Sequence, residues 1–326
     1  MPSSERPQWP PLPEVPRYLY AGQLTGRDNY RMVEQTGSRA EDVMRWVVGL
    51  DPESEIGKRI AKGLQRPQSG LVDSRGRIIV ADNSIPALLV FDELQGKFGV
   101  WLKAGEGKKF SSPVGVAHGP KGEVLVADSQ LKWVVRLNPE GEPVGTFGKE
   151  VLARPTGLAR DAERGIVYVA DSQADDIKVF DDHGTLLRTI GKMGEEPGEF
   201  NAPTHLTFKE GRLYVSDTLN ARVQVFDRQD KLVLTIGQRG LNMGNLVRPK
   251  GVAVDGEGHI YVVESFHDYL LVYDSEGRFL MPIGGTGQEV GSFFLPSGLW
   301  IDERERVFIS DMFNGRVTIL QFLGGS

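Results

Sequence analysis

The chain has 326 residues, no cysteine and a formal net charge of −6 at pH 7. The lack of cysteine excludes disulfides and thiolate metal ligands, and no apolar run of about 18 residues marks a membrane-spanning helix. Lys and Arg occur singly among carboxylates, so the overall field disfavours a nucleic-acid partner.

The first 16 residues contain six prolines, which favour extended polyproline II structure over packed structure. We predict a Pro-rich linker or tether over residues 1–16, either a disordered tail or a spacer that holds the rest of the chain off a surface. No basic region followed by an apolar stretch opens the sequence. We therefore expect either an exported protein whose signal peptide is absent from this chain, or a cytoplasmic protein.

Two different elements are expected before the main body of the chain. Residues 17–24 read R-Y-L-Y-A-G-Q-L and have the composition of a strand. Residues 38–50 begin with a capping box formed by Ser38 and Glu41, and apolar residues follow at positions 43, 46, 47 and 50. This spacing predicts a helix packed on the rest of the fold. Residues 43–49 also resemble a strand, which leaves a second candidate for pairing with the chain end.

From about residue 66 to residue 322 the chain repeats one unit. Each unit has four short runs rich in β-branched and aromatic residues, separated by Asp, Gly, Ser or Glu. A proline opens each unit, at positions 67, 113, 155, 203, 249 and 296, and an acidic residue ends its second run, at positions 82, 128, 171, 217, 264 and 311. A period of about 45 residues with four strands is typical of a β-propeller blade. The sequence predicts an all-β fold of six four-stranded antiparallel blades.

The fourth unit contains L-Y-V-S-D-T-L-N-A-R-V-Q-V-F-D, and the sixth keeps D-M-F-N-G-R-V-T-I-L. With the opening proline and the closing I-G, these units resemble NHL repeats. The resemblance implies a six-bladed propeller, but it implies little about activity, because the family includes RNA-binding and protein-binding modules, exported bacterial proteins and a few enzymes. The Pro-rich start ahead of R-Y-L-Y-A-G is similar to that of exported, lipid-anchored bacterial members.

The sixth unit supplies only three strands before the chain stops, so we expect the ring to be closed by residues 17–24 beside residues 316–321. The loops between first and second strands, and between third and fourth strands, are short. The links between blades are long and variable, and strand alternation puts them on the same face as the second-to-third-strand loops. We predict that this elaborated face binds partners.

Several residues on that face are candidates for partner contact. Glu264 departs from the Asp of the other units and precedes Phe266, His267 and Tyr269, which we expect in an exposed loop. Phe313 and Trp133 occupy related loops. Exposed aromatics suit recognition of a protein or a sugar polymer, although half-buried packing against a neighbouring link explains them equally well. The acidic residue of each unit is expected to bond the following turn rather than to form a central ion site.

Two large residues interrupt the innermost strands. His205 stands where the other units have Gly or Ser, and Trp300 stands where they have Leu, Ala or Thr. We expect both side chains near the central channel, either filling it or touching a ligand. Zinc lyases with this fold carry several histidines just after the opening proline, whereas here only His205 lies near that position.

These patterns favour a non-catalytic binding scaffold, exported and attached to a surface, whose partner is a protein or a polysaccharide. We predict no catalytic residue, no cofactor and no bound metal. The alternatives are a lyase or a lactonase-like hydrolase working at the channel mouth, and an RNA-binding NHL module, which the net charge disfavours.

Overall fold

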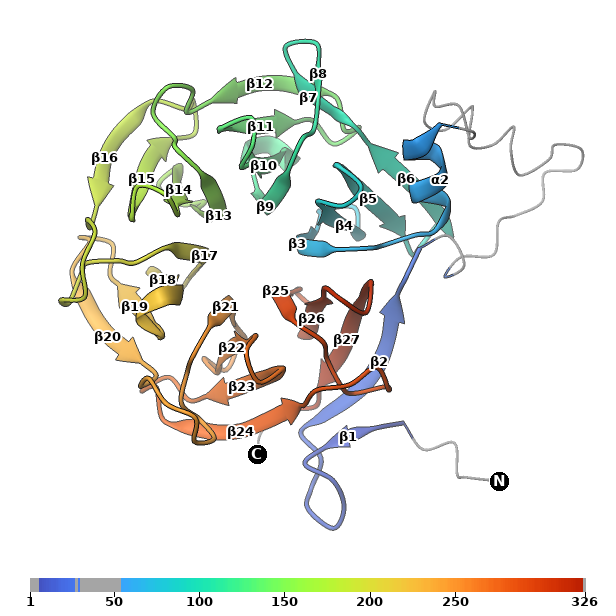
Figure 1. The fold of residues 1–326 in the computed structure, drawn as a ribbon, viewed down its shortest axis with the longest axis vertical. Coiled ribbons are helices and arrows are strands. Elements are labelled where there is room, and N and C mark those ends of the chain that lie inside the picture. The colour runs from blue at the N-terminus through green and yellow to red at the C-terminus, as the bar shows by residue number, and fades with distance from the viewer. Residues whose placement is uncertain (1–5, 27–28, 30–53, 325–326) are drawn as a thin grey trace, which may run out of the picture.

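The protein is a ring of six blades, seen along the ring axis in the computed structural model, which describes residues 6–26, 29 and 54–324 (Figure 1). Among these residues the strands of each blade pair antiparallel and in sequence order, with the first strand nearest the axis. The predicted fold class is confirmed. The predicted helix over residues 38–50 lies outside the described residues.

Blades 1 to 3 contain β3 (Pro67–Val72), β4 (Arg77–Asp82), β5 (Ala87–Asp92), β6 (Lys97–Trp101); β9 (Pro113–His118), β10 (Val124–Asp128), β11 (Trp133–Leu137), β12 (Pro143–Phe147); and β13 (Pro155–Asp161), β14 (Ile166–Asp171), β15 (Asp176–Asp181), β16 (Leu186–Ile190). Blades 4 to 6 contain β17 (Pro203–Lys209), β18 (Arg212–Asp217), β19 (Arg222–Phe226), β20 (Leu232–Ile236); β21 (Pro249–Val254), β22 (Ile260–Glu264), β23 (Tyr269–Tyr273), β24 (Phe279–Gly284); and β25 (Pro296–Ile301), β26 (Arg306–Asp311), β27 (Arg316–Phe322), β2 (Tyr18–Leu24).

Each blade is apolar on both of its faces because it packs between two neighbours. The second and third strands are almost wholly buried, whereas the outermost strands are half exposed, as in β16 and β20. The buried side chains form six clusters, and each cluster lies between two adjacent blades. A single blade therefore cannot bury its own apolar surface, and the closed ring is the stable unit.

The ring closes through strand β2, which pairs antiparallel with β27 from Tyr18 opposite Phe322 to Leu24 opposite Val317. The hydroxyl groups of Tyr18 and Tyr261 lie 3.0 Å apart, and the Tyr261 hydroxyl donates to Asp255 Oδ2 at 2.7 Å, so closure is also held by a buried polar chain between blades 5 and 6. The predicted closing strand is confirmed.

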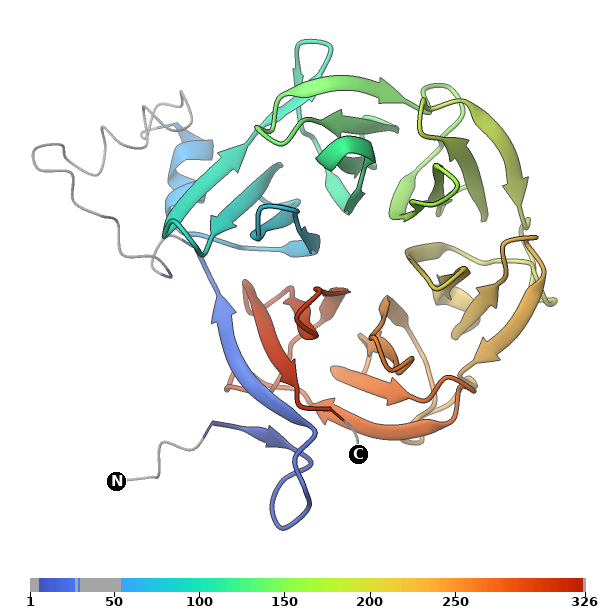
Figure 2. The same cartoon turned by 180° about the vertical axis from the view of Figure 1, so that it is seen from behind.

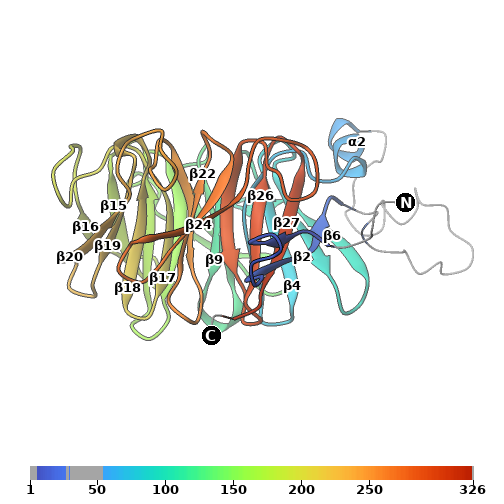
Figure 3. The ribbon, with the colours of Figure 1, turned by 90° about the horizontal axis from the view of Figure 1, so that it is seen from below.

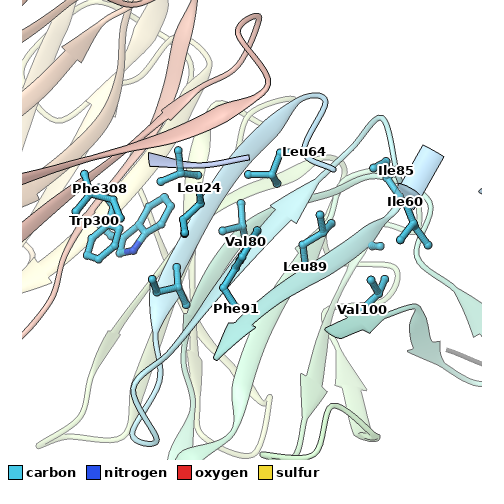
Figure 4. Close-up of a cluster of buried hydrophobic side chains, with 14 of the residues drawn as sticks. Leu24, Ile60, Leu64, Val80, Ile85, Leu89, Phe91, Val100, Trp300 and Phe308 are labelled. Atoms are coloured by element: carbon cyan, nitrogen blue, oxygen red, sulfur yellow. The ribbon is translucent and has the colours of Figure 1, made fainter. Parts of the chain in front are cut away.

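The cluster between the last and the first blade shows how the two chain ends are joined (Figure 4). Trp300 stacks on Phe308, with ring centroids 5.3 Å apart, and both side chains face Leu24 of β2 and Val80 of β4. The short helix α2 (Glu55–Ala61) was not predicted; it begins at the Ser54 N-cap and adds Ile60 to the same cluster. Blades 6 and 1 thus share a core built from both ends of the sequence.

The described part of the segment predicted as a linker packs on the propeller. β1 (Gln8–Trp9) pairs with β2, so that Gln8 lies opposite Leu19 and Trp9 opposite Tyr18. The Trp9 side chain packs against the cluster between blades 5 and 6. β1 is therefore a fifth strand on blade 6, and Trp9 covers apolar surface that an extended spacer would leave in water, whereas residues 11–15 are exposed.

The two faces of the ring differ in their connections, as predicted. We call the link face the one that carries the second-to-third-strand loops, α2 and the blade-to-blade links 102–112, 148–154, 191–202, 237–248 and 285–295. The turn face carries the remaining short turns, which Figure 2 shows toward the viewer, together with the one-turn η2 (Pro120–Gly122). Figure 3 shows the disc from its side, with α2 toward the upper face and the end of β27 toward the lower face.

Two small elements also belong to the link face. The first link forms a hairpin of β7 (Lys103–Gly105) and β8 (Lys108–Lys109), which the sequence analysis did not predict. The loop of blade 4 forms a single 3-10 turn, η3 (Thr218–Asn220). Within the described residues, no helix is long and apolar enough to cross a bilayer.

Removal of residues 1–24 should destabilise the protein far more than removal of residues 1–16. The longer deletion removes the buried Tyr18 and Leu24 and exposes the edge of β27. We expect the free energy of unfolding to fall by at least about 4 kcal/mol, with self-association visible by size-exclusion chromatography. The shorter deletion removes only β1 and should keep the protein monomeric. Thermal and urea unfolding of both proteins measure this, and a 1–24 deletion that melts like the full chain would show that β2 does not close the ring.

Candidate functional site

The acidic residue at the end of each second strand accepts backbone N–H groups of the incoming link, and in blades 1, 2 and 5 it also accepts those of the following loop. Asp82 is fully buried and accepts the N–H groups of Gln65 and Arg66 from the incoming link, and those of Ser84 and Ile85 from the following loop. Asp128 accepts four N–H groups at the equivalent positions. The expected bond to the following turn is therefore present, and the carboxylate also fixes the link, which the sequence did not reveal.

Glu264 performs the same task as the Asp residues, so its treatment as a departure was wrong. It is 1% exposed, and Oε1 accepts the N–H of Arg248 at 2.6 Å while Oε2 accepts the N–H of His267 at 2.8 Å. These donors hold the positions of Arg66 and Ile85 around Asp82. Because every oxygen is already bonded within the protein, Glu264 has no role as an open contact residue.

The loop after Glu264 presents one large aromatic side chain to solvent. Phe266 is 53% exposed and packs edge-on against the ring of His267, with centroids 4.9 Å apart. His267 is half-buried and its Nδ1 lies 2.9 Å from Glu264 Oε2, so its ring is fixed in place. Tyr269 is half-buried at the start of β23 and packs against the core between blades 4 and 5. Of the three predicted contact residues, Phe266 is the most accessible.

A second exposed aromatic group lies on the same face at blade 6. Phe313 is 47% exposed, and its ring lies 5.5 Å from that of Phe294, which is 39% exposed. The N–H of Phe313 donates to the carbonyl of Phe294 at 3.1 Å, so the loop and the link form one surface. The guanidinium of Arg66 lies 5.3 Å from the centre of the Phe313 ring. Phe313 was predicted as a contact residue, whereas Phe294 and Arg66 were not.

Trp133 is not part of this exposed surface, and the expectation of exposure was wrong. Its side chain is 3% exposed at the start of β11. The ammonium groups of Lys108 and Lys149 lie 4.7 and 4.8 Å from its ring centre. These lysines come from the β7–β8 hairpin and from the next link, so two segments distant from Trp133 in the sequence cover the ring.

The central channel forms a cavity of about 290 Å³ between the six first strands. Its wall includes the ends of the first strands and turn residues on the turn face, such as His118, Arg160 and Glu303. The channel therefore opens toward the turn face, opposite to the exposed aromatic groups. Burial lowers the pKa of His118, and Arg160 forms a two-bonded ion pair with Asp182. This charged mouth was not anticipated from the sequence.

His205 and Trp300 both line the channel, as predicted, but they lie differently. His205 is half-buried in the wall, and its Nδ1 lies 3.0 Å from Thr204 Oγ1. Burial, with a smaller effect of Lys250, lowers the pKa of His205 to about 3, so its imidazole is neutral at physiological pH. Trp300 is 8% exposed and packs mainly sideways on Phe308, and Nε1 has no hydrogen-bond partner among the described residues.

Among residues 6–26, 29 and 54–324, no group of three or more His, Cys, Asp or Glu side chains is arranged to hold a metal ion. His118 and His205 sit at different levels of the channel wall, because His118 ends β9 whereas His205 is near the start of β17. The channel as described offers two imidazoles, a guanidinium and carboxylates rather than a closed ligand set.

No protein-family model matches the chain. Human NHL-repeat-containing protein 4 is 34% identical to it over 85 residues, which are 26% of this chain and 64% of that protein. The resemblance to NHL repeats is confirmed. Because the match covers less than two thirds of the human protein, the whole protein's activity and partners are not carried over.

Solved structures share the propeller fold at low sequence identity. Virginiamycin B lyase from Staphylococcus aureus has a TM-score of 0.58 at 12% identity, covering 81% of this chain and 82% of the lyase. A gluconolactonase from Xanthomonas campestris has a TM-score of 0.61 at 17% identity, covering 79% and 86%. An auxiliary nutrient binding protein from Bacteroides ovatus has a TM-score of 0.62 at 15% identity, covering 79% and 69%. At these identities the likeness shows the fold alone.

The propeller also carries a charged group whose environment was not predicted from the sequence. Lys250 directly follows the opening proline of blade 5, where the other blades carry Gln, Val, Thr or Ser. Burial, followed by the charges of Arg248 and Arg154, lowers its pKa to about 8. The sequence does single out Lys250, because it is the one charged residue among the six that follow the opening prolines.

Stability should depend on pH through His205. The folded-state pKa of His205 lies below its ordinary value. Below about pH 6.5 the unfolded chain therefore binds a proton that the folded protein excludes, and the free energy of unfolding decreases as the pH is lowered. We expect His205→Asn to reduce the loss of unfolding free energy between pH 7 and pH 5 by about 1 to 2 kcal/mol.

Urea denaturation at both pH values measures this difference in slope, which does not depend on whether the variant is more or less stable at pH 7. His183→Asn, at an exposed turn, is the matched control and should leave the pH dependence unchanged. Parallel pH profiles for wild type and His205→Asn would contradict a neutral, buried imidazole.

Proposed function

We propose that the protein is a binding scaffold that recognises a protein or a polysaccharide through its link face. The observation that carries the proposal is the distribution of large exposed apolar side chains. Among the residues that the structure describes, nine lie on the link face and one, Leu94, lies on the turn face, with the others on outer strands and near the chain ends. The nine are Val151, Met193, Leu219, Leu241, Met243, Phe266, Val290, Phe294 and Phe313.

Exposed apolar side chains on one face support a binding role because they cost free energy in water and gain it when covered. A buried carboxylate fixes the end of each link, and three links also contain an isolated bridge, such as Met193 with Phe200 and Thr286 with Phe293. A fixed backbone that presents aromatic side chains loses little conformational freedom on binding. The link face is thus organised in advance for contact.

A catalytic role in the channel is the second candidate. Its support is the cavity of about 290 Å³, which contains His118, Arg160 and Glu303 and opens on the turn face. Propellers named as a lyase and a gluconolactonase share this fold. The two candidates occupy opposite faces, so substitutions on one face leave the other candidate untouched.

We also propose that the protein works outside the cytoplasm, attached to a bacterial surface. The support is the Pro-rich segment before the closing strand and its likeness to that of exported NHL proteins. The described part of this segment pairs with β2, so residues 6–16 do not act as a free spacer. Fractionation of source cells, with detection in the surface or periplasmic fraction, tests this assignment, and recovery in the cytoplasm alone refutes it.

Changing both Phe266 and Phe313 to Ala should weaken partner binding without unfolding the protein. Truncation of one central aromatic side chain costs about 2 kcal/mol of binding free energy, which corresponds to about a 30-fold loss of affinity. Because both rings are about half exposed, we expect the melting temperature to change by less than about 2 °C. Immobilised wild-type and variant proteins are compared for capture from extracts of source cells, and each captured partner is then purified and titrated.

The matched control is Leu94→Ala with Leu187→Ala, which removes exposed apolar surface from the turn face and from outer strand β16. This control should bind like wild type. Equal binding by the Phe variant and wild type would refute the link face as the interface. An equal loss in the control would also refute it, because the effect would then be general rather than local.

A further inference from the structure

Four basic side chains surround the link-face end of the central channel. Arg66, Arg154 and Arg248 each immediately precede the opening proline of a blade, in blades 1, 3 and 5, and Lys250 follows the proline of blade 5. These prolines begin the first strands, which lie nearest the axis (Figure 1). We call this group the basic ring. Its three arginines are exposed and Lys250 is half-buried.

The basic ring has no counter-charge within the described part of the chain. None of its four members forms an ion pair or a side-chain hydrogen bond there, whereas other arginines near the core do. Arg77 pairs with Asp73, Arg222 with Asp217 at 2.8 Å, and Arg316 with Asp311 at 2.8 Å. In a protein of net charge −6, four unpaired cations at one place are unusual.

The carboxylates that bond the backbone of Arg154 and Arg248 are already occupied. Asp171 accepts the backbone N–H of Arg154 at 2.8 Å and that of Ala153, and Glu264 accepts the backbone N–H of Arg248 at 2.6 Å. These buried oxygens serve the backbone of the same residues whose side chains point elsewhere. The two buried carboxylates reduce the positive potential of the basic ring, but they do not pair with its guanidinium groups.

Three cations of the basic ring, Lys250, Arg154 and Arg248, lie close enough to act on one another. Arg248 and Arg154 both disfavour the charged form of Lys250, and Lys250 in turn disfavours the charged form of His205. Lys250 is partly removed from water without any carboxylate to compensate. The electrostatic free energy of this arrangement is unfavourable when no anion is bound. A bound anion would make it favourable.

The surroundings of the basic ring point to an anion that is part of an apolar surface. Arg66 lies over the ring of Phe313, which itself contacts Phe294. Cations and exposed aromatics therefore occupy the same region of the link face. A polyphosphate backbone would offer charge without an apolar complement, whereas an acidic polypeptide segment offers both carboxylates and apolar side chains.

We propose that the basic ring is a binding site for the carboxylate groups of an acidic segment on a partner protein. This proposal rests on the proposed function, because it names the chemistry that the link face recognises at its centre. Lys250 supplies a partly desolvated ammonium group, and Arg154 and Arg248 supply guanidinium groups that bind carboxylates in a two-bonded geometry. The exposed Phe side chains contact apolar residues of the same segment.

The test uses a dye-labelled hexaglutamate peptide and the full chain, measured by fluorescence anisotropy at fixed ionic strength. Lys250→Gln combined with Arg154→Gln should weaken peptide binding by about tenfold or more. The matched control is Lys231→Gln combined with Lys209→Gln, one exposed and one half-buried lysine on the turn-face side. It removes the same charge and should bind like wild type, because the effect is local.

Thermal unfolding accompanies each measurement. Loss of the unpaired Lys250 charge should leave the melting temperature unchanged or raise it, so weak binding by an unfolded variant is recognised. Equal weakening in the control, or no weakening in the basic-ring variant, overturns the site. Tighter binding of an oligouridine than of hexaglutamate, lost in the same variant, overturns the assignment to an acidic polypeptide.

The outcome is separable from that of the proposed function. If the Phe266 and Phe313 variant loses the captured partner while the basic-ring variant keeps hexaglutamate binding unchanged, the link face binds its partner without this anion site. If the basic ring binds hexaglutamate but the Phe266 and Phe313 variant captures the partner as well as wild type does, the anion site is supported and the apolar interface is refuted.

Discussion

The structure depends on a buried carboxylate at the end of the second strand of every blade. In every blade this group accepts at least one backbone N–H group from the incoming link, and in blades 1, 2 and 5 it also accepts backbone N–H groups from the following loop. Unsatisfied buried N–H groups are costly, so these carboxylates stabilise irregular segments of the link face. In blades 4 and 6 the carboxylate also pairs with an arginine, Arg222 or Arg316, whose other N–H groups donate to link carbonyls.

This arrangement explains how one face varies while the ring stays constant. The links bring different side chains to the surface, yet their backbones return to the same carboxylate before the opening proline. The turn face lacks this freedom, because its short turns are closed locally by Asp side chains such as Asp227 and Asp274. Exposed apolar groups therefore accumulate on the link face, where covering them costs no rearrangement of the blades.

The two ends of the channel offer different chemistry. The turn-face end is open and contains His118, the paired Arg160 and Glu303, whereas the link-face end is bordered by the basic ring. Neutral His205 lies between them. A negatively charged protein with a positive centre on its aromatic face suits a partner that is acidic only where it meets that centre, because elsewhere the net charge repels acidic surfaces.

The sequence by itself determined the blade number, the strand order, the closing strand and the face that carries the long connections. These features depend on patterns within about 45 residues, namely turn residues, alternating apolar runs and the two anchor columns. Phe266 and Phe313 were recognisable as loop aromatics for the same reason. The tertiary structure alone decided which side chains are open. Trp133 is buried because Lys108 and Lys149 arrive from separate links, and Glu264 is occupied because Arg248 and His267 meet at its carboxylate. The basic ring arises only when six prolines, each in its own blade, are brought around one axis.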